Sequence, residues 1–195
     1  YYMSVLCSFM QNPSLQCYEA AQSVLLYVGH TRGLTIRYSR TFAVPDCLSA
    51  HADSIRSNFG LHAFSDASWT APKSTCGYTV FMSGGPIAWC SRKLHIITDS
   101  SALAEYSAAS ATSKELAFIR NLLRDLLCPL SSPTTLAVDN KAAIKISEER
   151  GVSKLTKHFD FAAHRIRDDV EHLRIRCIFV DTYDQTADPL TKAMS

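Results

Sequence analysis

Long hydrophobic runs, cysteine pairs and a strong charge imbalance are all missing from this sequence of 195 residues. Without an uncharged apolar run of about 18 residues, no membrane-spanning helix is expected. The seven cysteines are scattered, with no Cys-x-x-Cys pair. This argues against a disulfide framework or a zinc site and favours reduced, mostly buried thiols. A formal net charge of +2 permits nucleic-acid binding without demanding it, because a local basic stripe matters more than the sum.

No secretory leader is expected in this sequence, because Tyr1 opens a mixed segment with no basic start and no cleavage site. The first residue is not methionine, so we expect the chain to be a fragment of something longer. An apolar content of 47% and a charged content of 19% are typical of a globular protein with a hydrophobic core. The length fits one domain, or one domain with an appendage.

The first part of the chain is expected to be helical. Apolar residues recur at helical spacing over residues 14–28, where Ser14 gives a start and Gly29 an end. Residues 34–38 alternate and predict a short strand, and residues 39–58 indicate an irregular connector. The apolar face of the helix would stay partly exposed without a neighbouring domain to cover it. That face consists of Leu15, Tyr18 and Leu25.

The sequence changes character near Gly60, where short apolar runs rich in β-forming residues begin. The predicted strands cover residues 61–65, 77–82, 86–92, 134–138 and 174–180. The predicted helices are a long one over residues 101–127, one that follows the fourth strand and ends at Ile146, one over residues 159–172, and a last turn or two over residues 187–194. We therefore divide the chain into a helical segment with its linker over residues 1–58 and an α/β domain over residues 59–195.

The order of these elements implies a five-stranded mixed sheet flanked by helices, with an N-terminal helical extension. The first three strands form an antiparallel meander with a turn at Ser83-Gly84-Gly85. The fourth strand returns through a helix, which favours a parallel pairing beside the first. Asp66 and Asp139 then lie at the same edge of neighbouring strands. Glu105 lies one turn into the covering helix, and Asp188 begins the last one.

These four acids each have a simple structural explanation. Aspartate tolerates the turn predicted at Asp66, Asp139 with Asn140 can cap a helix, and a helix dipole favours Asp188. A carboxylate at Glu105 is costly to bury without a partner, so its simple explanation is exposure at the rim or compensation by a nearby charge. Together, however, they form the donor set of a two-metal phosphodiester hydrolase, because Mg²⁺ takes oxygen ligands and only a few from protein. Asp66 is the expected bridging ligand.

Basic residues are candidates for phosphate contacts, although a solvated helix face is the simpler explanation for any one of them. They are Lys141, Lys145, Lys154, Lys157 and Arg165. Trp69 and Tyr106 stand near the acids, and we interpret both as core aromatics rather than as base-stacking residues.

Short motifs follow one another along the chain in a fixed order. They are Ser65-Asp66-Ala67, Lys73-Ser74-Thr75-Cys76-Gly77-Tyr78, Ala104-Glu105-Tyr106, Asp139-Asn140-Lys141-Ala142-Ala143, Thr156-Lys157-His158 and Ala187-Asp188-Pro189-Leu190-Thr191-Lys192-Ala193. Together they resemble the RNase H domain of Ty1/copia-type LTR retrotransposon polyproteins. Residues 9–13, 19–21 and 24–28 resemble the segment that links the polymerase thumb to that domain.

The resemblance implies an RNase H-like fold and hydrolysis of the RNA strand of RNA–DNA hybrids. It implies Mg²⁺ or Mn²⁺, two ions in all, held by Asp66, Glu105, Asp139 and Asp188. The polymerase part of the same polyprotein is the implied protein partner, and the implied location is intracellular, either a cytoplasmic retroelement particle or the nucleus. Within the motifs, the expected nucleic-acid contacts are Lys73, Ser74, Asn140, Lys141 and Lys157.

The chain departs from the family pattern in several places. The stretch between Trp69 and Lys73 is shorter than usual, and Leu103 stands where a second glutamate is common. Residues 181–187 contain no histidine, whereas many cellular RNases H carry a mobile one shortly before the last aspartate. The paired aspartates of a polymerase palm are absent, so this chain should not synthesise DNA by itself.

Two other interpretations remain. In the first, the chain is a decayed or domesticated relic with a binding or structural role. In the second, it is another RNase H-like nuclease such as an integrase. The survival of all four acids argues against a relic. The fourth acid, the motif that begins at Asp139 and the thumb-like segment argue against an integrase.

Overall fold

One mixed sheet organises the chain, and the computed structural model describes it through residues 1–70, 73–148 and 162–193. Within these ranges the sheet has five strands in the order β3-β2-β1-β4-β5. The strands are β1 (His62–Ser68), β2 (Thr75–Met82), β3 (Gly85–Lys93), β4 (Thr134–Val138) and β5 (Ile175–Phe179). β1 pairs antiparallel with β2 and parallel with β4. The predicted α/β class is confirmed, with a five-stranded mixed sheet flanked by helices.

The turn between β2 and β3 explains why this hairpin was predictable. Ser83 and Gly84 occupy it with φ angles of 53° and 84°. Positive φ at both central residues matches the twist of the flanking strands, and glycine adopts it without steric cost. The predicted turn at Ser83-Gly84-Gly85 is confirmed, with Gly85 already in β3.

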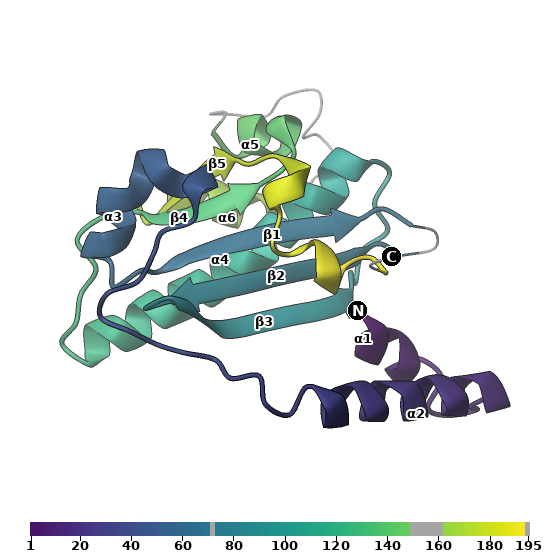
Figure 1. The fold of residues 1–195 in the computed structure, drawn as a ribbon. Helices are drawn as coiled ribbons and strands as arrows, with labels where there is room; N and C mark the ends of the chain where they lie inside the picture. Colours follow the sequence, from purple (N-terminus) through teal and green to yellow (C-terminus); the bar gives the residue numbers. More distant parts are fainter. Residues whose placement is uncertain (71–72, 149–161, 194–195) are drawn as a thin grey trace.

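Three helices cover one face of the sheet (Figure 1). They are α4 (Ser101–Asp125), α5 (Lys141–Glu148) and α6 (Ala162–Glu171). Their buried side chains, among them Tyr106, Leu116 and Ile166, pack with Leu136 and Val138 of β4 in the larger hydrophobic core. Of the predicted helix over residues 159–172, the first three residues lie outside the described ranges. No helix in the described ranges combines the length and apolar character needed to cross a membrane.

Two short helices lie on the opposite face of the sheet, the 3-10 helix η1 (Asp46–His51) and α3 (Ala52–Ser57). Their side chains Leu48 and Ile55 are fully buried in a second core with Phe64 of β1. The prediction of an irregular connector over residues 39–58 is therefore wrong for this part. Each helix has six residues, which is too short for helical periodicity to show in the sequence.

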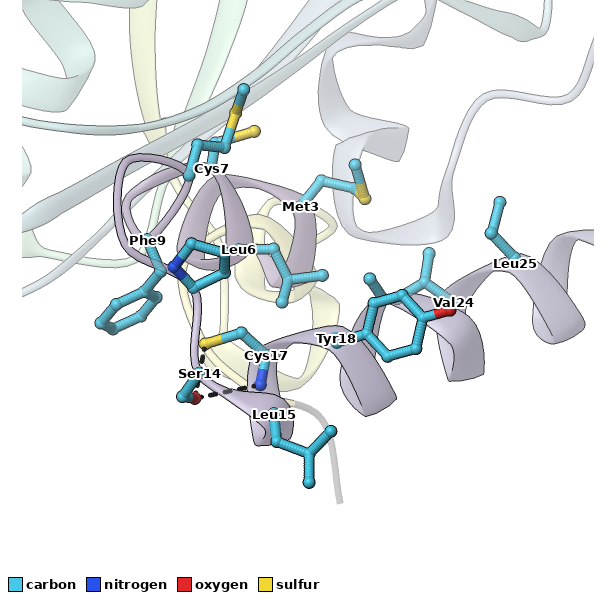
Figure 2. A pocket seen from close by; sticks show the side chains of 13 residues that line it. Met3, Leu6, Cys7, Phe9, Ser14, Leu15, Cys17, Tyr18, Val24 and Leu25 are labelled. Atoms are coloured by element: carbon cyan, nitrogen blue, oxygen red, sulfur yellow. Dashed lines mark hydrogen bonds between the residues drawn. The ribbon is translucent and has the colours of Figure 1, made fainter.

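The N-terminal helices stand apart from these layers (Figure 1). They are α1 (Tyr2–Cys7), which the sequence did not predict, and α2 (Leu15–His30), which confirms the predicted helix. Figure 2 shows the apolar groove of about 690 Å³ that their side chains line. The expected exposed face is present, since Leu15, Tyr18 and Leu25 are 73%, 60% and 71% exposed.

Some local predictions were wrong. Residues 34–38 form no strand. The end of this segment contacts the β2–β3 hairpin, where the Tyr38 hydroxyl donates to the Pro86 carbonyl at 2.7 Å and the Ser39 amide donates to the Ser83 carbonyl at 2.9 Å. The last helix is the single 3-10 turn η3 (Asp188–Leu190). The cysteines were expected to be mostly buried. All seven are free in the described part of the chain, but only Cys76 and Cys177 are buried. The division of the chain at residue 58 stays a prediction.

Candidate metal centre

Two aspartates lie side by side where β1 and β4 run parallel. Ser65 of β1 pairs with Val138 of β4, so the next residue along each strand is an acid, Asp66 and Asp139. Asp66 is still inside β1 rather than after it, which corrects the predicted end of that strand. Its carboxylate is buried, and Asp139 at the end of β4 is half-buried. The predicted neighbourhood of the two acids is thus a consequence of parallel pairing.

Glu105 joins the two aspartates from α4. The hydroxyl of Ser100 caps this helix by accepting from the Leu103 amide. Ala104 and Ala108 are fully buried, and such small side chains let the helix lie close to the sheet. Among the described residues, Asp66, Glu105 and Asp139 each offer a carboxylate oxygen, and these oxygens lie within 4.8 Å of one another.

The electrostatics of Glu105 fit a cation-binding cluster. Burial, followed by the charges of Asp66 and Asp139, raises the pKa of Glu105 to about 9. Its Oε2 atom is buried and has no hydrogen-bond partner in the described part of the chain. Burial also raises the pKa of Asp66, against the opposing effects of Thr191 and Lys192. Three oxygen donors with one unpaired suit a hard divalent cation, which would favour the ionised forms.

The fourth predicted acid, Asp188, stands beside this cluster rather than within it. It begins η3, and its Oδ1 lies 2.9 Å from the Nζ atom of Lys192. The same Nζ lies 3.8 Å from Oδ2 of Asp66. An ammonium group thus lies close to both Asp66 and Asp188, at the edge of the acidic site.

The C-terminal turn supplies contacts that sequence reasoning missed. Thr191 is buried, and its hydroxyl donates a hydrogen bond to Oδ2 of Asp66. Buried Gln185 donates from Nε2 to the Ser65 carbonyl at 3.0 Å, which ties the segment before the turn to β1. Thr191 stands inside the Ala187–Ala193 motif, but no spacing rule links it to an acid so distant along the chain.

Comparisons with known proteins show which proteins this chain is similar to. No protein-family model matches the chain. The retrovirus-related Pol polyproteins from transposons RE1 and RE2 of Arabidopsis thaliana are 31% and 32% identical to it over its full length. The chain is a homologue of Ty1/copia-type Pol polyproteins. It spans 13% of the length of each of these two relatives.

One more Pol polyprotein and two solved structures are also similar to this chain. The retrovirus-related Pol polyprotein from transposon TNT 1-94 of Nicotiana tabacum is 29% identical over 98% of this chain and 14% of its own length. RNase H1 from Halobacterium salinarum NRC-1 has a TM-score of 0.47 at 18% identity, covering 67% of this chain and 92% of its own. The N-terminal RNase H domain of a Mycobacterium tuberculosis protein has a TM-score of 0.47 at 14% identity, covering 67% and 89%.

The residues predicted to contact nucleic acid have different surroundings. Lys73 is exposed, whereas Ser74 is buried and its hydroxyl is 2.7 Å from that of Thr98. Asn140 caps α5, where its Oδ1 accepts from two backbone amides. Lys141 is exposed, with Nζ 4.5 Å from the ring centre of Phe179. Lys157 lies outside the described residues, as does Lys154.

The two aromatic residues near the acids differ. Tyr106 is buried in the main core, as predicted. The interpretation of Trp69 as a core residue is wrong, because its side chain is 56% exposed. β1 ends at Ser68, so Trp69 lies beyond the covered part of the sheet, and its indole N–H donates to the Thr98 carbonyl at 2.9 Å.

Proposed function

We propose that this chain is a metal-dependent endoribonuclease that hydrolyses the RNA strand of RNA–DNA hybrids. The observation that carries the proposal is the cluster of buried Asp66 and Glu105 with half-buried Asp139, whose carboxylate oxygens lie within 4.8 Å of one another. The RNase H-like sheet and the homology to retrotransposon Pol polyproteins support it. The fourth acid, the motif that begins at Asp139 and the thumb-like segment argue against an integrase-like role.

Two divalent cations, Mg²⁺ or Mn²⁺, would supply an activated water at neutral pH and stabilise the leaving oxygen. Neighbouring side chains orient the carboxylates that would bind these cations. Thr191 fixes one oxygen of Asp66, and the Thr182 hydroxyl donates to Oδ2 of Asp139 at 3.1 Å. Glu105 would be protonated near neutral pH without a cation, so metal binding there releases a proton.

Substrate binding would use the exposed surface around the acids. RNA selection comes from contacts to 2′-hydroxyl groups across the minor groove of the hybrid, and phosphate contacts make the affinity salt-dependent. Lys73, Lys141 and Lys157 remain the candidate phosphate contacts, and exposed Trp69 adds a candidate for sugar or base contacts. The polymerase part of the same polyprotein is the proposed partner for the apolar face of α2, inside the cell.

The test is cleavage of a labelled RNA–DNA hybrid in Mg²⁺ and in Mn²⁺, with duplex DNA and duplex RNA as controls. Only the RNA strand of the hybrid should be cut, and D66N and D139N should abolish cutting. D53N is the matched control, because Asp53 is an exposed aspartate that pairs with Arg56 at 3.6 Å. Undiminished cleavage by D66N would contradict the mechanism.

One observation favours a second candidate, a catalytically decayed domain that still binds nucleic acid. The ammonium of Lys192 lies 2.9 Å from Asp188 and 3.8 Å from Asp66, where it already compensates part of the negative charge. Hybrid binding by the folded chain with no cleavage in either metal would support this candidate and overturn the first.

A further inference from the structure

We propose that Lys192 is a resident counter-ion of the acidic site, which holds Asp66 and Asp188 together without metal and competes with a divalent cation for them. The inference rests on the proposed metal site. It concerns how the two acids are held before a cation binds, and not which substrate the site cleaves. It assigns to Lys192 a positioning role that acts on the two acids and thereby sets metal affinity.

The geometry of the lysine supports this role. Its Nζ atom is within ion-pair distance of both acids, at 2.9 Å from Asp188 Oδ1 and 3.8 Å from Asp66 Oδ2. The Asp66 side chain is 1% exposed, whereas that of Lys192 is 41% exposed, so the lysine reaches the buried acid from the surface. A cation at the same oxygens would meet a positive charge already in place.

The backbone at Lys192 is held while its side chain remains long and partly solvated. The Lys192 amide donates to the Asp188 carbonyl at 3.0 Å, and the neighbouring Thr191 anchors the turn on Asp66. The ammonium can therefore rotate into water without moving the turn, because a lysine carries its charge on a flexible four-carbon stem. Displacement of the charge leaves both acids in position for metal.

Charge compensation in the cluster is uneven. Lys192 pairs with Asp66 and Asp188, whereas Glu105 keeps a buried oxygen without a hydrogen-bond partner among the described residues. Clustered carboxylates repel one another unless a positive charge is near. Competition should thus weaken a cation held between Asp66 and Asp188 far more than one held by Glu105 and Asp139.

The experiment is calorimetric titration of the metal-free protein with MnCl₂, without nucleic acid. We expect K192M to bind Mn²⁺ about tenfold more tightly than the wild type, or to gain a second binding event, because one short-range charge repulsion is removed. K192R keeps the charge and should bind like the wild type. K114M is the matched control, since Lys114 is an exposed lysine further along α4.

A second measurement separates competition from simple packing. In EDTA, K192M should melt at a lower temperature than the wild type, and saturating Mn²⁺ should remove this difference. K192Q gives the same two readouts if K192M is poorly folded. Unchanged or weaker Mn²⁺ binding in both K192M and K192Q, or no binding by any of these proteins, would overturn the proposal. Tighter binding supports it even if no hybrid is cleaved, so the two proposals fail separately.

Discussion

Gly77 lies directly opposite Asp66 on the neighbouring strand, and the C-terminal turn occupies the space that a side chain there would need. A β-carbon at Gly77 would lie 2.6 Å from Cγ2 of Thr191 and 2.9 Å from Cβ of Leu190. The φ angle of Gly77 is not positive, so the requirement for glycine here is steric. The hydrogen bond from Thr191 to Asp66 and the ion pair of Lys192 both depend on this close approach.

Gly77→Ala should therefore push the C-terminal turn off the sheet. We expect a destabilisation of about 1–3 kcal/mol from overpacking, with a loss of metal affinity and of hybrid cleavage. Thermal unfolding and Mn²⁺ titration measure the two effects. Gly33→Ala is the control, because a β-carbon at Gly33 would meet nothing within 4 Å. Equal metal affinity in Gly77→Ala and the wild type would show that the turn does not need this contact.

The hydroxyl of Thr191 should set the acid limit of activity. Its hydrogen bond lowers the pKa of Asp66, which burial raises. Thr191→Val keeps the volume but leaves the carboxylate without this donor, so the pKa of Asp66 should rise further. Because metal binding needs the ionised form, the acid limb of the pH–rate profile should move to higher pH. Thr191→Ser retains the hydroxyl and should keep the wild-type profile; an unshifted Thr191→Val would exclude the role.

The sequence was sufficient to predict parts of the fold in which a pattern within one element determines a contact between distant residues. Parallel pairing of β1 with β4 followed from the helix between them, and it placed Asp66 beside Asp139 without any further information. The small face around Ala104 and Ala108 likewise predicted how close α4 comes to the sheet. In each case the pattern extended over several residues of one regular element, so periodicity could be read directly.

The same reasoning failed where one or two residues meet across the fold. Thr191 and Gly77 contact each other only because the chain returns to the sheet at its end, and no spacing in the sequence encodes that return. Leu48 and Ile55 were missed because their helices are too short to show a period. The ion pair of Lys192 with Asp66 was missed because a lysine after a helical turn is typical of a solvated surface.

Glu105 predicts how stability depends on pH without metal. Its pKa is about 9 in the folded chain and 4.5 in the unfolded one. Between these values the folded state holds a proton that the unfolded state has lost, so the free energy of unfolding falls as pH rises from about 4.5 to 9. Melting temperatures in EDTA should follow this slope, and Glu105→Gln should flatten it. Glu19→Gln, at an exposed position, should keep it, and an equal slope in Glu105→Gln would contradict the assignment.

The division of the chain at residue 58 can be tested through the second core. Leu48 is fully buried there, so Leu48→Ala should destabilise the chain by about 2–5 kcal/mol, whereas Leu25→Ala at a 71% exposed position should change little. A fragment that begins at residue 41 keeps Leu48 and Ile55 and should unfold cooperatively on heating. A fragment that begins at residue 59 exposes Phe64, their neighbour in that core, and should melt lower or fail to fold. Equal melting temperatures of the two fragments would mean that η1 and α3 add nothing to the stability of the sheet.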